Sequence, residues 1–425
     1  MKRIFCFFRE KFKRLGPGFI TGAADDDPSG VATYSIAGAQ FGYKLNFLSL
    51  FLIPLMISIQ EMCARIGMCS GMGLAGVIKK YYSKKLLYFA VLLLVTANTI
   101  NIGADLGIMA SCLELLFKLP YLLWLIVVTL FTVVLEIFIP YKKYSVYLRW
   151  LGLTLCVYII TAFIAGQNWR EVIKYTFIPH IEFNLNYLMT MVGFIGTTIS
   201  PYLFFWQASE EVEEEINKGV IKDFMEKPHI NYKDILYMRS DTSLGMIFSN
   251  IISIFIVITT AATLFRNGIT DIESPRQAAL ALKPLAGDFA FLLFTFGIIG
   301  IGLQSVPVLS GGIAYVISET FGFKEGLGKK LFHAKMFYLI LALGTIIGAI
   351  LNLIGINPIK ALFYTAIING IVSVPLIAII LKLSDDKRVV GDYKTMKINK
   401  ILGYVALVFI GLSSLFMLIK LLIAF

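Results

Sequence analysis

The stretch GAADDDPSGVA, residues 22–32, places three consecutive aspartates and a Pro-Ser-Gly sequence inside an apolar segment. A helix that crosses lipid needs about 20 mostly apolar residues, and charge inside such a helix is costly. Proline removes a backbone donor and disfavours helical geometry at the residue before it. Because lipid offers no partner to the freed carbonyl groups, we expect this break to line a cavity or face other protein.

The composition of the whole chain is that of a membrane protein. Of its 425 residues, 58% are hydrophobic and only 15% are charged, whereas roughly a quarter are charged in soluble proteins. The net charge of +11 does not indicate nucleic acid as a partner, because basic residues gather on cytoplasmic loops of membrane proteins. We therefore predict an all-α integral membrane protein in contact with the lipid bilayer.

Eleven apolar segments are long enough to cross a bilayer. They lie at 17–41, 46–67, 87–117, 120–140, 147–166, 188–209, 242–265, 287–318, 332–353, 360–381 and 401–424. With the N-terminus inside, 29 of the 38 Lys and Arg residues fall on inside segments and 9 on outside segments. The excess predicts a multi-pass protein of the inner or plasma membrane, with a cytoplasmic N-terminus and an extracytoplasmic C-terminus.

Two of these spans are interrupted by helix breakers at comparable places. The first contains Asp-Pro-Ser-Gly at 27–30, and the sixth contains Gly196 followed by Ser-Pro-Tyr at 200–202. Each broken span opens a group of five, and an odd number of helices turns the second group upside down. This pattern is typical of inverted-repeat transporters, whose broken helices meet at the bilayer midplane and form the ion site. Simple proline kinks are the alternative explanation.

The repeat pattern divides the chain into four parts. We expect a basic cytoplasmic N-terminus at 1–16 and a first repeat of helices 1–5 at 17–166. A second, inverted repeat of helices 6–10 follows at 188–382, and one extra helix at 399–424 completes the chain.

Asp27 is the strongest candidate for a metal ligand. It directly precedes the proline, so its backbone should leave the helix and its side chain should face the break. A carboxylate beside unwound carbonyls offers hard oxygen ligands, which suit Mg²⁺ or Mn²⁺. We expect Ser200 and the backbone carbonyl near Thr197 to add oxygens, directly or through water. Gly30 and Tyr202 should shape the cavity.

Other acids in the spans have two explanations each. Asp25 and Asp26 point away from Asp27, because successive helical residues lie about 100° apart. They either line an aqueous vestibule that attracts cations or have no specific role. Asp105 is either a second acid on the ion path, where it could accept a proton, or the partner of a nearby hydroxyl.

The remaining polar groups are accessory candidates. Three residues on otherwise apolar helices either orient ligands and water or hold helices together: Gln304, Asn369 and Ser373. Three glutamates near span ends are explained by interfacial placement: Glu61, Glu114 and Glu136. The run EEVEEE at 210–215 is expected to be a solvated helix end, with a cation-attracting mouth as the alternative.

Four stretches resemble one known family. They are GPGFITGAADDDPSGVATYSIAGAQFGY at 16–43, IQEMCARIGMCSG at 59–71, GIGLQSVPVLSGGIAYVI at 300–317 and SDDKRVVGDYKTMKINKILGY at 384–404. These segments resemble the NRAMP family of divalent-metal transporters, over residues from about 15 to 420. The resemblance implies a LeuT-like fold with alternating access and eleven or twelve helices.

The sequence departs from the family pattern at its metal-binding positions. Family members carry Asp-Pro-Gly-Asn in helix 1 and Met-Pro-His in helix 6. Here the Asp-Pro pair is kept at 27–28, but Gly30 stands at the position of the metal-binding asparagine. Ser200 replaces the methionine, and Tyr202 replaces the histidine linked to proton movement.

These departures favour a harder metal ion. Without the thioether, softer metals lose an advantage, and a roomier site suits Mg²⁺, which keeps several waters. In helix 3 the family's acidic pair corresponds to Ile102 and Asp105, which indicates weak or absent proton coupling. The pattern resembles the NRAMP-related magnesium transporter branch. It predicts an importer with Mg²⁺ favoured and Mn²⁺ accepted, driven by membrane potential, with metals as substrates and no cofactor.

Three alternatives remain. A proton-coupled Mn²⁺ or Fe²⁺ transporter of the standard NRAMP type would use Asp27 and Asp105 to carry protons. A transporter of organic solutes with the same fold is disfavoured by three aspartates at the break, which would repel an anionic substrate. A membrane enzyme or sensor has no nucleotide loop, nucleophile–base pair or soluble domain to support it.

Overall fold

A computed structural model describes residues 16–139 and 155–424, and every regular element in these ranges is helical. The longer helices are α2 (Pro17–Asp25), α3 (Pro28–Phe41), α4 (Asn46–Ser70), α5 (Leu74–Tyr81), α6 (Lys84–Phe117), α7 (Tyr121–Phe138), α9 (Cys156–Ile164), α10 (Trp169–Phe177), α11 (Leu185–Thr198), α12 (Pro201–Asn217), α13 (Tyr232–Thr263), α16 (Ala290–Phe321), α17 (Lys335–Leu351), α18 (Pro358–Asp385) and α20 (Lys397–Ala424). The shorter ones are η2 (Phe265–Asn267), α14 (Pro275–Ala279), η3 (Leu280–Leu282), α15 (Lys283–Ala286), η4 (Gly287–Phe289), η5 (Leu331–His333), η6 (Asn352–Ile354) and α19 (Lys387–Val390).

Nine helical segments in the described part of the chain are long and apolar enough to cross a membrane. Two of the eleven predicted spans are not among them. The span at 17–41 is divided between α2 and α3, each too short on its own. The span at 147–166 lies partly outside the described residues, and α9 is its described portion. The count of eleven therefore stays a prediction.

Both breaks lie where the sequence predicts them. α2 ends at Asp25 and α3 begins at Pro28, while α11 ends at Thr198 and α12 begins at Pro201. Each proline takes the first position of its helix, where its missing N–H needs no helical partner. One boundary is wrong by ten residues: the helix expected at 242–265 begins at Tyr232. A capping box between Asn231 and Asp234 starts it early.

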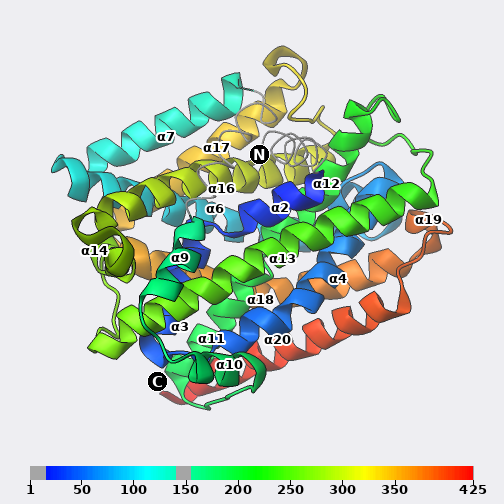
Figure 1. The fold of residues 1–425 in the computed structure, drawn as a ribbon. Coiled ribbons are helices and arrows are strands. Elements are labelled where there is room, and N and C mark those ends of the chain that lie inside the picture. Colours follow the sequence, from blue (N-terminus) through cyan, green and yellow to red (C-terminus); the bar gives the residue numbers. More distant parts are fainter. Residues whose placement is uncertain (1–15, 140–154, 425) are drawn as a thin grey trace, which may run out of the picture.

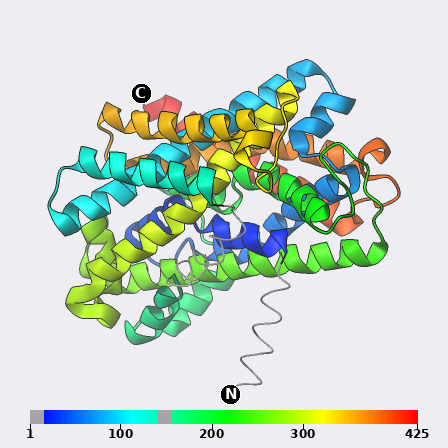
Figure 2. The same cartoon turned by 90° about the horizontal axis from the view of Figure 1, so that it is seen from above.

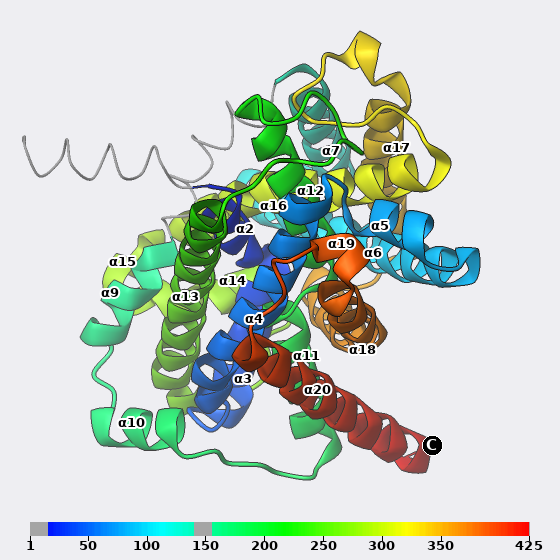
Figure 3. The same ribbon diagram turned by 90° about the vertical axis from the view of Figure 1, so that its right-hand side faces the viewer.

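The long helices pack side by side around the broken pair (Figure 1). α13 crosses the centre and packs on α2, α3 and α4, while α11 and α20 both pack on α18. On the other side of the molecule, α16 packs on both α6 and α17, as the turned view shows (Figure 2). Of the most apolar stretch of 185–217, 94% is buried, against 28% for 397–423. The second broken span is thus enclosed by protein, whereas α20 lies at the edge (Figure 3).

Glycines bring α2 and α13 into backbone contact. A Cβ added at Gly22 would lie 2.3 Å from the carbonyl carbon of Gly245, and one at Gly245 would lie 2.5 Å from the carbonyl oxygen of Gly18. Real Cβ atoms do not approach so closely, so only glycine fits this interface. The contact fixes α2, and with it the first break, against the central helix.

Two of the glutamates near span ends, Glu61 and Glu136, are buried among other helices, while their interfacial level stays a prediction. Glu61 forms an ion pair with Arg65 and accepts a hydrogen bond from Asn399 Nδ2 at 3.0 Å. Glu136 accepts hydrogen bonds from Ser310 Oγ at 2.9 Å and Thr345 Oγ1 at 3.2 Å. Internal partners on other helices make burial of these acids possible. Glu114 is partly exposed, as expected near a span end.

The run at 210–215 is also less solvated than predicted. Glu211, Glu213 and Glu215 are only 3–6% exposed. Gln207 donates to Glu211 at 2.8 Å, and the hydroxyl of Tyr315 donates to Glu213 at 2.8 Å. The prediction of a solvated helix end is therefore wrong for these three side chains, because neighbouring helices cover them.

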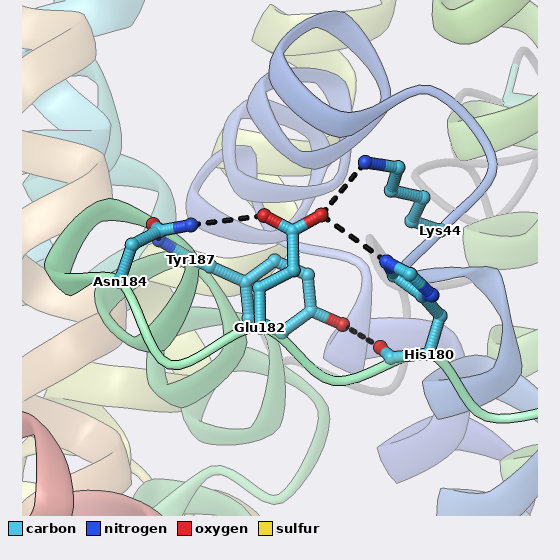
Figure 4. A network of polar contacts seen from close by, with 5 residues as sticks. All are labelled: Lys44, His180, Glu182, Asn184 and Tyr187. Carbon is cyan, nitrogen blue, oxygen red and sulfur yellow. Dashed lines mark hydrogen bonds and ion pairs between the residues drawn. The ribbon is translucent and has the colours of Figure 1, made fainter.

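A polar network joins the end of α3 to the loop before α11 (Figure 4). Lys44 Nζ donates to Glu182 Oε1 at 2.7 Å, and His180 Nε2 lies 3.2 Å from the same oxygen. Asn184 Nδ2 donates to Glu182 Oε2 at 2.9 Å, while the hydroxyl of Tyr187 donates to the carbonyl of His180. The hydrogen bond from Lys44 is the main cause that lowers the pKa of Glu182. The network thereby connects the chain just after α3 to the chain just before α11, at the ends of these helices that are remote from the breaks.

Replacing Glu182 by glutamine should therefore destabilise the protein by ~0.5 kcal/mol at pH 7, as expected for a partly exposed ion pair. A depressed carboxylate pKa stabilises the fold above the unfolded value of about 4.3 and stops doing so as pH falls through the folded value. Thermal unfolding of Glu182→Gln should thus approach that of the wild type in acid. Glu273→Gln, at an exposed loop position, is the control. A pH-independent difference would contradict this account.

Candidate functional site

The first break turns Asp27 into the cap of α3 and buries its carboxylate in the protein. Asp27 Oδ1 accepts hydrogen bonds from the backbone N–H of Gly30 and the hydroxyl of Ser29, both at 2.7 Å. Asp27 Oδ2 accepts one from Asn101 Nδ2 on α6 at 3.0 Å. The side chain is 1% exposed. The structure therefore has the predicted arrangement, in which the residue before Pro28 leaves the helix and its side chain faces the break.

The second break lies against the first. Thr197 Oγ1, at the end of α11, lies 3.3 Å from Ser29 Oγ. A Cβ built on Gly30 would lie 3.4 Å from Thr197 Oγ1 and 3.5 Å from Asp27 Oδ1, which are ordinary contacts. Position 30 therefore faces the oxygen group formed by Asp27, Ser29 and Thr197. A larger side chain there would extend among these atoms.

Asn101 is the site residue that our reading of the sequence missed. It is buried, and its amide oxygen has no hydrogen-bond partner in the described structure, although its amide nitrogen donates to Asp27. An unpaired buried acceptor is costly, so this oxygen is a candidate ligand for a cation beside Asp27. The spacing of four residues between Asn101 and Asp105 on one helix face was the signal available in the sequence.

Tyr202 supplies the hydrogen bond that the first proline removes. In an unbroken helix the carbonyl of Ala24 would accept from the N–H of residue 28, but Pro28 has none. The hydroxyl of Tyr202 donates to the carbonyl of Ala24 at 3.1 Å instead. Tyr202 therefore connects the second broken span to the end of α2 and is fully enclosed, at 1% exposure.

Ser200 does the same for the second proline. The carbonyl of Thr197 would accept from the N–H of residue 201, which is Pro201. Ser200 Oγ donates to the Thr197 carbonyl at 2.8 Å, and it also lies 3.0 Å from the carbonyl of Gly196. The Ser-Pro-Tyr sequence thus provides the hydroxyl donors for both breaks.

Asp25 and Asp26 turn away from Asp27, as the sequence predicts, and both reach α13. Ser249 Oγ lies 2.5 Å from Asp25 Oδ2 and 3.2 Å from Asp26 Oδ1. The two aspartates are 0% and 3% exposed, so in this conformation they do not line an open vestibule. Packing of α2 on α13 through glycines encloses them.

The other predicted accessory residues lie outside the hydrogen-bonded group around Asp27. Ser305 Oγ donates to Asp105 Oδ2 at 2.8 Å, which matches the hydroxyl-partner alternative for this acid. Ser373 donates to the carbonyl of Gly370 at 2.8 Å, on its own helix. Gln304 and Asn369 are buried with unpaired amide atoms, and no hydrogen bond found in the described residues joins them to Asp27.

The oxygen group has a distinct chemical character. Within residues 16–139 and 155–424, no group of three or more His, Cys, Asp or Glu side chains could hold a metal ion. The group consists of the single carboxylate of Asp27, the hydroxyl oxygens of Ser29 and Thr197, and the unpaired amide oxygen of Asn101. Neutral oxygens with one carboxylate form a weak, hard-ligand environment, suited to a cation that keeps part of its water shell.

Fold and site together define a multi-span membrane protein in which two broken helices meet at one buried aspartate. Residues 18–420 match the profile of the family described as natural resistance-associated macrophage protein-like, or Nramp. The chain belongs to this family.

Individual relatives align with this chain over nearly its full length. The chain is 27% identical over 408 residues to the divalent metal cation transporter MntH of Caldanaerobacter subterraneus subsp. tengcongensis, covering 94% of this chain and 90% of the relative. It is 25% identical over 425 residues to MntH of Listeria welshimeri, covering 97% and 90%.

Solved structures confirm the predicted fold class. A manganese transporter from Eremococcus coleocola aligns with a TM-score of 0.72 at 19% identity, covering 97% of this chain and 87% of that one. Mhp1, a nucleobase-cation-symport-1 family transporter, aligns with a TM-score of 0.61 at 11% identity, covering 95% and 92%. The arrangement is the LeuT-like fold. The repeat boundaries proposed from the sequence remain predictions.

Because the Tyr202 hydroxyl replaces the missing N–H of Pro28, removing it should lower the stability of the protein. Tyr202→Phe leaves the carbonyl of Ala24 buried without a donor, which should lower the free energy of unfolding by about 1–3 kcal/mol. Thermal unfolding in detergent measures this change. Tyr364→Phe removes an exposed hydroxyl on α18 and should have little effect. Equal melting temperatures for both variants would show that the hydrogen bond from Tyr202 to Ala24 does not replace the one that Pro28 removes.

Proposed function

We propose that the chain imports divalent metal cations, with Mg²⁺ favoured and Mn²⁺ accepted. The observation that carries this proposal is Asp27, a single buried carboxylate held at the meeting point of two helix breaks among neutral oxygens. Ser200 and Thr197 are the further proposed ligands. A hydroxyl that donates to a carbonyl, as Ser200 does, keeps its lone pairs for a cation.

The preference for Mg²⁺ rests on the ligand chemistry of positions 30 and 200. Ser200 stands where the family carries a methionine, so this position offers a cation a hydroxyl oxygen and no thioether sulfur. Softer transition metals gain from sulfur ligands, whereas Mg²⁺ prefers oxygen and keeps several waters. With glycine at position 30, no side chain extends among Asp27, Ser29 and Thr197, where the family carries an asparagine.

We further propose that transport needs no proton. The tyrosine at position 202 does not titrate near neutral pH as a histidine does, and its hydroxyl is occupied by the Ala24 carbonyl. Uptake would be driven by the membrane potential, which supplies about 4.6 kcal/mol per 100 mV to a divalent cation. This assumes the predicted orientation in the inner or plasma membrane, with the N-terminus in the cytoplasm.

A proton-coupled Mn²⁺ transporter of the standard Nramp type is the second candidate. The names of the relatives favour it: the similar sequences are named divalent metal cation transporters, and the similar structure is a manganese transporter. At these identities the relatives differ from this chain at most positions. The two candidates therefore have to be separated by experiment.

Proteoliposomes loaded with a Mg²⁺-sensitive or pH-sensitive dye test the function directly. Wild-type protein should import Mg²⁺ under an inside-negative potential without acidifying the lumen. Asp27→Asn keeps the shape of the side chain but removes its charge, and should reduce uptake to the level of empty liposomes. Asp271→Asn, at an exposed loop position, should leave uptake unchanged.

Retained uptake in Asp27→Asn would remove the central claim about the site. Uptake of Mn²⁺ alone, accompanied by acidification of the lumen, would establish the second candidate instead. No flux of either ion in protein that melts cooperatively would argue against a transporter.

Selectivity can be tested at the two positions that depart from the family. The double variant Gly30→Asn, Ser200→Met should shift preference from Mg²⁺ toward Mn²⁺ by roughly tenfold, equivalent to ~1.4 kcal/mol. A Cβ at position 30 meets only ordinary contacts, so the first atom of the new side chain fits without a clash. Gly30→Asn, Ser200→Ala loses the same hydroxyl without adding sulfur and is the matched control. An equal shift in both variants would show that sulfur is not the cause.

A further inference from the structure

A groove of about 660 Å³ opens on the surface between α5, α18 and α20, away from the site around Asp27. We call it the α18–α20 groove. Its inner part is apolar and includes Ala378, Leu381 and Leu407. Its outer part is charged and aromatic, and includes Tyr82 and Lys382. An apolar floor below a charged rim is the chemistry of an amphiphile, not of a water-soluble ion.

The groove lies where two membrane helices reach the membrane boundary. α18 ends at Asp385 and α20 begins at Lys397, so both change from apolar to charged residues at this level. Ala378 lies seven residues inside the end of α18, a depth of about 10 Å at 1.5 Å per residue. Tyr82, on the rim, is of a residue type that favours the membrane–water interface.

Most charges on the rim are already paired. Arg388 donates to both oxygens of Asp386 at 2.6–3.1 Å, and the Tyr82 hydroxyl donates to Asp386 at 2.8 Å. The hydrogen bonds from Arg388 hold the pKa of Asp386 well below its usual range, so this pair stays charged and satisfied. Asp385 pairs with Lys400 at 2.8 Å.

Lys382 is the remaining charge on the rim. It is exposed, and the described structure gives it no carboxylate within ion-pair distance; its ammonium lies 5.1 Å from the ring centre of Tyr82. With the other charges paired, the groove carries one surplus positive charge at the level of the headgroups. A phosphate diester carries one negative charge and would complement it.

We propose that the α18–α20 groove binds an anionic phospholipid of the surrounding bilayer. The phosphate would lie against Lys382, and the glycerol and the first part of an acyl chain would lie on Ala378, Leu381 and Leu407. The proposal is independent of the ion that the protein carries. Its occupant is a lipid because the apolar floor has no use for a free phosphate ion.

Native mass spectrometry of the full-length protein in detergent, titrated with phosphatidylglycerol or phosphatidylcholine, tests the proposal. The wild type should bind phosphatidylglycerol about fivefold more tightly, the effect of one lysine near an anionic headgroup. Lys382→Gln should lose this preference. Lys387→Gln, an exposed position on α19 that does not line the groove, should keep it.

Ala378→Trp tests the apolar part, because it fills the groove without changing its charge. It should weaken binding of both lipids, with a melting temperature close to that of the wild type. Retained preference in Lys382→Gln, or retained binding in a well-folded Ala378→Trp, would overturn the proposal. So would displacement of phosphatidylglycerol by millimolar inorganic phosphate, which would indicate a simple anion site.

Discussion

The rest of the site depends on how two buried backbone carbonyls are satisfied. Pro28 and Pro201 each remove the N–H that a helix would supply four residues further on, and lipid cannot replace it. Hydroxyls of Tyr202 and Ser200 take that place at the carbonyls of Ala24 and Thr197. Without such donors, each break would cost about 1–3 kcal/mol for every unpaired carbonyl.

Satisfying the carbonyls also determines what faces the break. Once α2 is ended and held by Tyr202, Asp27 is free to cap α3 and hold Ser29 beside Thr197 from the other break. The same aspartate that stabilises the start of a helix is thereby the charge that we propose binds a cation. The structural role and the proposed metal-binding role therefore fall on one side chain, so a substitution of Asp27 tests both at once.

The sequence predicted what is local and missed what depends on neighbours. Proline positions located both breaks within a residue or two, and the residue before Pro28 was correctly placed at the break. Asn101 was missed because its own segment shows only that it shares a helix face with Asp105, and not that α6 reaches Asp27. Burial of Glu61 and Glu213 was missed for the same reason, since their partners Asn399 and Tyr315 lie far away in sequence.

The glycine contact between α2 and α13 has a mechanical consequence. Interlocked side chains resist sliding because each must change rotamer to pass the next. Gly22 and Gly245 present bare backbone to the facing helix, so at these two positions no side chain would have to change rotamer if α2 moved along α13. Movement of α2 is opposed instead by hydrogen bonds: the N–H groups of Gly16 and Phe19 donate to Asp241, and Ser249 donates to Asp25, so these polar contacts with α13 set the position of the half-helix.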